Sequence, residues 1–216
     1  MKAVLPNKRP GLLLIDTDIL VLLAASGLLE QVTSSLGYES SQLRRLAAAP
    51  HQIRKSKSFR DQFGQAVLLK IEPIVAMILA AEAPTNLELL DELNSTEFID
   101  EGEAQLMALA ASQHLSLLVT GDKRAVIALA ASTAHSCIGA LQGKIVSLEA
   151  AILILLTKIQ ACELRKAFSA VLQHKTLRIV LSESTTTNHK NCVAAVESYY
   201  EDLRRQSSGL LINPIW

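Results

Sequence analysis

The stretch GLLLIDTDILVLLAASGLL, residues 11–29, places Asp16 and Asp18 inside an otherwise apolar run. Removing a carboxylate from water without giving it a partner is costly, so these side chains are expected either to cap a helix or to bind a cation. Residues 11–15 are typical of a short, fully buried strand, and the apolar spacing over residues 19–36 is helical. The stretch therefore predicts a buried strand, two carboxylates and a helix in succession.

Composition narrows the class of protein. Half of the 216 residues are hydrophobic, which excludes a disordered chain and allows one substantial core. Lys plus Arg equals Asp plus Glu at 21 each, so attraction to nucleic acid must come from local clusters. The three cysteines form no CxxC motif, so the sequence indicates neither a zinc site nor a disulfide framework. The first thirty residues otherwise resemble a signal peptide, but Asp16 and Asp18 interrupt its apolar stretch. We expect a cytoplasmic protein without a membrane segment.

Strands and helices are expected to alternate along the chain. Helices are predicted at residues 40–49, 61–81 with a break near Pro73, 86–93, 101–113 and after Thr120-Gly121-Asp122, and strands at residues 115–119 and 135–138. This alternation predicts an α/β fold with a central parallel sheet flanked by helices.

The chain changes character near residue 143. Apolar residues from Ile145 to Cys162 keep a helical spacing, which predicts a long amphipathic helix packed on its own domain or forming a dimer seam. A polar loop at residues 182–191 and a helix at residues 192–205 follow, and the apolar end, residues 210–216, is expected to dock. We therefore expect a domain at residues 1–142 and a mainly helical extension at residues 143–216, packed on the domain or on a partner.

Three acidic residues are predicted to meet at one edge of the sheet. Asp16 and Asp122 follow strands, and Glu103 lies in the first turn of the helix that leads into the second strand. Ligand sites in such sheets lie beyond the carboxyl ends of the strands. Each acid also fits a helix cap, and Asp100 with Glu103 has the spacing of a capping box.

The same stretch of sequence offers no cation to neutralise these acids. No Lys or Arg occurs between Glu82 and Glu103. Converging carboxylates repel one another unless one is protonated or a metal lies between them. Oxygen ligands without His or Cys suit Mg²⁺ or Mn²⁺.

Three blocks of sequence resemble the PIN-domain superfamily of metal-dependent nucleases: IDTDIL, GEAQLMALAA and LLVTGDKRAVIAL. The similarity spans about residues 11–138 and implies a three-layer PIN-like fold. It also implies that Asp16, Glu103 and Asp122 hold Mg²⁺ or Mn²⁺ and hydrolyse phosphodiester bonds, with RNA favoured over DNA. Many proteins of this family are toxins, so an antitoxin-like protein is an expected partner, as is a second copy of the chain.

The resemblance leaves two acidic positions open. The family usually has a further acid on a helix after the first strand, and Glu39 in LGYESSQLRRL is the best candidate, although it also reads as a solvated residue at a helix start. Asp18 stands where the family often has a small polar residue, so it is either an additional metal ligand or part of the helix cap.

Positive charge for a phosphate chain is concentrated in two places. The residues expected to contact nucleic acid are Arg44, Arg45, Arg54, Lys55, Lys57, Arg60, Lys123 and Arg124. They predict salt-dependent binding, while the alternative is a solvated basic loop, since aromatic residues for base stacking are few.

Two other functions fit the sequence. One is a PIN-like module that has lost catalysis and serves in binding or assembly, because a fold does not guarantee a function. The other is a phosphatase of the HAD type, in which Asp16 of IDTDIL would attack phosphorus and Asp18 would act as acid and base.

Overall fold

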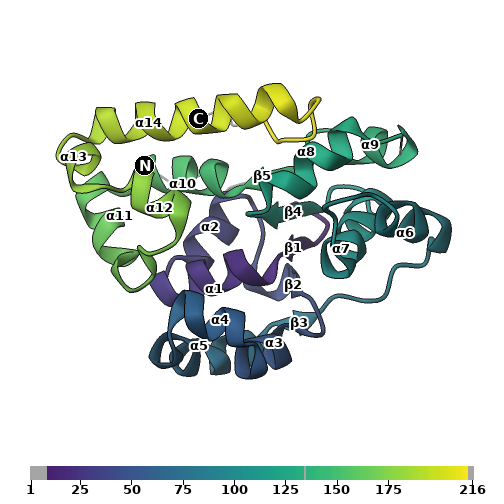
Figure 1. Cartoon of the computed structure of the whole chain (residues 1–216), viewed down its shortest axis with the longest axis horizontal. Helices are drawn as coiled ribbons and strands as arrows, with labels where there is room; N and C mark the ends of the chain where they lie inside the picture. The colour runs from purple at the N-terminus through teal and green to yellow at the C-terminus, as the bar shows by residue number, and fades with distance from the viewer. Residues whose placement is uncertain (1–8, 134, 214–216) are drawn as a thin grey trace, which may run out of the picture.

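The computed structural model describes residues 9–133 and 135–213, and an all-parallel sheet of five strands forms its centre (Figure 1). The strands are β1 (Leu13–Ile15), β2 (Leu43–Arg45), β3 (Leu79–Ala80), β4 (Leu117–Thr120) and β5 (Ile145–Ser147). They lie in the order β3-β2-β1-β4-β5, and Leu13 of the central strand pairs with Leu43 and Leu117. Helices flank the sheet, which confirms the predicted α/β class.

Helices make up most of the chain. Before β4 they are α1 (Thr17–Ser26), α2 (Leu29–Ser35), α3 (Ala49–Lys55), α4 (Lys57–Phe63), α5 (Gln65–Met77), α6 (Leu87–Asn94) and α7 (Glu101–Ser112). After β4 they are α8 (Lys123–Ala131), α9 (His135–Leu141), α10 (Leu148–Leu156), α11 (Ala161–Ala167), α12 (Lys175–Val180), α13 (Glu183–Thr186) and α14 (His189–Gln206). Figure 1 shows α14 along one end of the molecule and α3, α4 and α5 at the other, with the sheet between them.

The opening strand and helix follow from local sequence. All three residues of β1 are buried, as in a central strand that is covered on both faces. Asp16 caps α1, and Gly27 ends it with φ of 71°, a left-handed conformation that glycine adopts without steric cost. α1 and α2 meet at 111°, so the single helix expected over residues 19–36 is two helices.

Two further expectations between β1 and β4 are wrong. Residues 40–49 contain one turn of 3-10 helix (Ser40–Gln42) and then β2, because backbone pairing with β1 outweighs the local helical pattern. The helix expected over residues 61–81 consists of the end of α4, then α5 and then β3, and Pro73 lies inside α5 without breaking it. Buried Leu68, Ile71 and Val75 hold α5 against the core on both sides of the proline.

Two expectations after β4 are also wrong. The strand predicted at residues 135–138 is helix α9, whose buried Cys137 and Leu141 are spaced by one helical turn. The long amphipathic helix expected from Ile145 begins as β5 and continues as α10, whose nine residues are all buried. Because α10 is buried on every side, it offers no face for a dimer seam.

The end of the chain docks as expected through residue 213. Leu210 and Leu211 are buried, the Ile145 N–H donates to the Leu210 carbonyl (3.0 Å), and the Ile212 N–H donates to the Ile145 carbonyl (2.9 Å). Residues 214–216 lie outside the described residues. The helix expected at residues 192–205 is α14, and the polar segment before it contains the short α13.

The segment after residue 143 shares the central sheet, because β5 pairs with β4. The division into two domains at residue 142 stays a prediction. Within residues 9–133 and 135–213, no single helix combines the length and hydropathy needed to cross a membrane; α1 and α2 together pass that test only as a bent pair.

Candidate functional site

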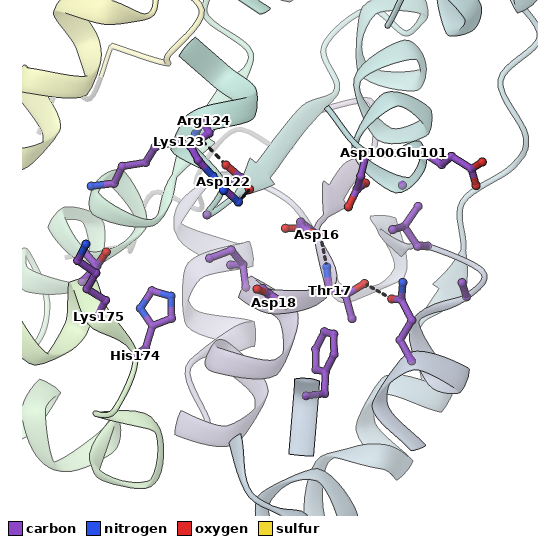
Figure 2. Close-up of a pocket in the computed structure, with 18 of the residues that line it drawn as sticks. Asp16, Thr17, Asp18, Asp100, Glu101, Asp122, Lys123, Arg124, His174 and Lys175 are labelled. Atoms are coloured by element: carbon purple, nitrogen blue, oxygen red, sulfur yellow. Dashed lines mark hydrogen bonds and ion pairs between the residues drawn. The ribbon is translucent and has the colours of Figure 1, made fainter. Parts of the chain in front are cut away.

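A pocket of about 840 Å³, called here the acid pocket, opens at the carboxyl ends of β1 and β4 (Figure 2). Its acidic lining residues are Asp16, Asp18, Asp100, Glu101 and Asp122. A smaller cavity of about 280 Å³, the side hollow, is lined by Phe98, Ile99, Asp100, Glu103, Asp122 and Arg124. Asp100 and Asp122 line both cavities, so the predicted acids gather where the two meet.

Asp16 lies directly after the central strand, and three other acids act on it. Its Oδ1 accepts the Thr17 N–H at 2.6 Å, which caps α1. Burial raises the pKa of Asp16 to about 7, helped first by repulsion from Asp18 and opposed by the Thr17 hydrogen bond. Asp100 and Asp122 add to the repulsion. Asp16 therefore holds a proton over part of the neutral pH range unless a cation replaces it.

Glu103 is held in place by the capping box that its spacing predicted. Its Oε2 accepts the Asp100 N–H at 3.0 Å, and the Asp100 Oδ1 accepts the Glu103 N–H at 2.8 Å. The residue is 8% exposed, and this burial raises its pKa to about 8, against the Asp100 N–H bond. Repulsion from Asp100, Asp122 and Asp16 adds to the shift. Glu103 and Asp16 thus interact across two different helix starts.

Asp122 caps α8 while facing both cavities. Its Oδ1 accepts the N–H groups of Arg124 (2.7 Å) and Ala125 (3.1 Å), and its Oδ2 forms an ion pair with the Arg124 guanidinium at 3.3 Å. A Cβ on Gly121 would meet the Ile19 Cδ1 at 2.8 Å. Glycine therefore lets this loop pass closely over α1.

Asp18, half-buried in the first turn of α1, also belongs to this group of acids. Burial raises its pKa, followed by repulsion from Asp122 and Asp100, while a hydrogen bond with Gln62 lowers it. The side chain lines the acid pocket rather than capping the helix.

The helix starts explain why so many acids tolerate one another. The N-cap residues of α1, α7 and α8 are Asp16, Asp100 and Asp122, respectively. The amino end of a helix carries a partial positive charge and unpaired N–H groups. The two interpretations of these acids, as helix caps and as a cluster, are therefore compatible. Each Asp caps its own helix, and all three line the acid pocket at one edge of the sheet.

The structure does not bring Glu39 to this site. Glu39 lies before β2, at the amino end of the strands, and lines neither cavity. Among the helices that follow β1, α3 instead presents Gln52, whose Oε1 accepts the Thr17 hydroxyl at 3.1 Å. The pocket thus receives an amide oxygen from this helix rather than a carboxylate.

Two of the eight basic residues expected at nucleic acid, Lys123 and Arg124, line the acid pocket. Those that line neither cavity are Arg44, Arg45, Arg54, Lys55, Lys57 and Arg60. Arg45 is buried and donates to the carbonyls of Val75 and Leu46, so it joins β2 to α5 instead of meeting a ligand.

Most of the other basic residues have partners within the chain. Arg44 donates to the Ser41 and Leu43 carbonyls, and Arg54 pairs with Glu72 at 3.5 Å. Arg60 donates to the Arg54 carbonyl. Lys55 and Lys57 are exposed on α3 and α4, whose residues Gln52 and Phe59 reach the pocket.

Sequence reasoning missed an entire wall of the acid pocket. This wall comes from α12 and α14 and consists of His174, Lys175, Thr176, Ile179 and Tyr199. No motif marks these residues, and they meet the acids only because the C-terminal helices pack back toward α1 and α8. Figure 2 shows Lys123, His174 and Lys175 on one side of Asp16, with Asp100 and Glu101 on the other.

An ion pair with a fully buried carboxylate lies beside this wall. Lys123 Nζ lies 2.6 Å from the Oε1 of Glu149, which has no exposed surface, and 5.3 Å from the centre of the Tyr199 ring. The buried Nδ1 of His174 has no hydrogen-bond partner within the described part of the chain. Burial lowers the pKa of His174, nearby Glu149 opposes this shift, and Lys123 adds to it.

The acidic side chains have the oxygen atoms that Mg²⁺ and Mn²⁺ prefer, but they are not arranged around one point. Within residues 9–133 and 135–213, no three Asp, Glu, His or Cys side chains are arranged to hold one ion. The donor set, several carboxylates without His or Cys, is the one that Mg²⁺ and Mn²⁺ prefer.

Comparisons of this chain with protein-family models, with curated proteins and with solved structures found no match. The resemblance to the PIN-domain superfamily therefore stays a prediction from three motifs.

Proposed function

We propose that this protein is a metal-dependent nuclease that hydrolyses phosphodiester bonds, with RNA favoured over DNA. One observation carries the proposal: acids from three helix starts converge at the carboxyl edge of a parallel sheet, with the pKa of Asp16 raised to about 7 and that of Glu103 to about 8. Such shifts are typical of functional sites. A structural role alone does not require this many mutually repelling carboxylates.

Asp16, Glu103 and Asp122 are the ligands that we assign to Mg²⁺ or Mn²⁺, with Asp18 as an additional carboxylate. Mg²⁺ commonly binds through one or two carboxylates and keeps several waters, so a cage of three protein ligands is not required. When bound, such a cation lowers the pKa of a nucleophilic water and offsets the charge that develops on the phosphate.

Basic groups at the pocket are suited to hold the phosphate of the substrate. Arg124, whose side chain is 77% exposed beside Asp122, offers N–H donors suited to phosphate oxygens. The amino ends of α1 and α8 add favourable helix dipoles. Lys123 is bound to Glu149 and contributes charge from a fixed place.

Cleavage of end-labelled single-stranded RNA and DNA with Mg²⁺ or Mn²⁺ tests this proposal. We expect products that require the cation, disappear with EDTA, and form faster from RNA. If the folded protein cuts neither substrate with either cation, it is not a nuclease of this kind.

A PIN-like binding module without catalysis is the second candidate. It is favoured by the absence of a three-ligand group within the described residues and by the contacts that already engage both oxygens of Asp122. In that case the same oligonucleotides would bind and remain intact.

A further inference from the structure

Two aromatic side chains are exposed in the described part of the chain, and both lie at the acids. Phe98, 59% exposed, lines the side hollow, and Tyr199, 38% exposed, lines the acid pocket. The other described aromatic side chains are buried or half-buried. Asp100 and Asp122 line both cavities, so each ring shares its cavity with these two acids.

The backbone at Phe98 is itself unusual. Its φ is 67°, in the left-handed region that bulky residues rarely adopt. Buried Ile99 and the capping residue Asp100 follow it directly, so the turn holds the ring outside the core at a conformational cost. Such strain persists where the surrounding structure enforces it, and it is concentrated at functional sites.

Tyr199 belongs to a wall that also carries positive charge. Lys175 is exposed on this wall, next to His174 with its unpartnered Nδ1. Because Lys123 is already bound to Glu149, Lys175 is the ammonium group on this side without an ion pair among the described residues. The wall thus combines a ring with a cation, the two groups that hold a base and its phosphate.

We infer that a nucleic acid strand crosses the acids between Phe98 and Tyr199, that each ring stacks on a base, and that Lys175 binds the phosphate on the Tyr199 side. The identity of this ligand rests on the proposed function, but binding requires no cleavage. Base stacking on aromatic rings tolerates any sequence, and the phosphate contact makes binding salt-dependent.

The test of the two rings is fluorescence anisotropy with short labelled single-stranded RNA and DNA. Mg²⁺ is present to offset the charge of the remaining acids, and every protein carries Asp16→Asn, so that cleavage does not interfere. Phe98→Gly and Tyr199→Ala should each weaken binding by roughly tenfold, as expected for loss of one stacked base. Glycine is chosen at position 98 because it removes the ring and accepts the positive φ.

Conservative and remote substitutions serve as controls for the rings. Phe98→Tyr and Tyr199→Phe keep a ring and should bind as the parent protein does. Leu69→Ala removes an apolar side chain that is also 59% exposed but lies on α5 and lines neither cavity. It should leave binding unchanged.

The phosphate contact has its own readout. Lys175→Gln should weaken binding by up to about tenfold and reduce the slope of log affinity against log salt by about 0.7, the value for one phosphate contact on a single strand. Lys166→Gln removes the same charge from an exposed position on α11, whose residues line neither cavity, and should change neither quantity.

Each outcome decides the inference separately from the proposed function. If oligonucleotides bind equally well to Phe98→Gly, Tyr199→Ala and the parent protein, the strand path is wrong even when wild type cleaves RNA. Failure of the parent protein to bind either nucleic acid also overturns it. Ring-dependent binding in this test, together with a wild-type protein that does not cleave, supports the path and rejects the nuclease. A preference between the RNA and DNA probes identifies which strand occupies it.

Discussion

Asp16→Asn should reduce cation-dependent cleavage by more than about a hundredfold, since even the outer partners of metal ligands typically cost 10- to 100-fold when they are removed. The amide lacks the charge that attracts a cation. It keeps the oxygen that accepts the Thr17 N–H, and Asn is as good a helix cap as Asp. The measurement is the rate of RNA cleavage in Mn²⁺ by wild type and variant.

Folding of the variant separates a ligand from a structural residue. At pH 8 Asp16→Asn should be at least as thermostable as wild type, because it removes a carboxylate whose raised pKa opposes folding there. Glu88→Gln, an exposed change on α6, is the matched control and should cleave normally. Normal cleavage by Asp16→Asn would exclude Asp16 as a ligand, and an unfolded variant would make it structural.

Thermal stability without divalent cations should fall as the pH rises from about 5.5 to 8.5. The folded-state pKa values of Asp16 (about 7) and Glu103 (about 8) lie above their ordinary values, so the folded protein binds more protons than the unfolded chain in this window. Their contribution is favourable at low pH and is lost as the pH passes through 7 and 8. We expect the melting temperature to decrease by about 10 °C.

Added Mg²⁺ or Mn²⁺ should recover much of this loss at pH 8.5, because a ligand that binds only the folded state stabilises it by mass action. Glu103→Gln should flatten the pH dependence, since its amide oxygen accepts the Asp100 N–H without needing a proton. A melting temperature that is constant or rises over the same pH range in EDTA would show that these acids are not protonated in the folded protein.

Local signals predicted the elements that build the acidic edge. The apolar run ending at Asp16, the capping box of Asp100 and Glu103, and the cap at Asp122 are all contained within a few neighbouring residues. Because parallel strands end at one edge, their order along the chain was enough to bring these acids together. Sequence spacing could not decide whether these carboxylates cap helices or bind a cation, since both roles use the same oxygen atoms.

The parts that sequence reasoning missed depend on distant contacts. β2 is a strand because it pairs with β1. The Arg45 side chain donates hydrogen bonds to the carbonyls of Val75 in α5 and of Leu46, so it is not available to a ligand. The wall with Lys175 and Tyr199 reaches the acids only through packing of α10 against α14 and of the chain end against β5. Neither arrangement leaves a periodic pattern near the acids.

Direct measurement of Mn²⁺ binding by calorimetric titration at pH 8 is the decisive experiment for the proposed cation site. Wild type should bind Mn²⁺ saturably, more weakly at pH 6, where protons compete for Asp16 and Glu103, and Asp16→Asn should lose most of the binding. Absence of binding by the folded wild-type protein at pH 8, or equal binding by Asp16→Asn, would contradict a cation site at these acids.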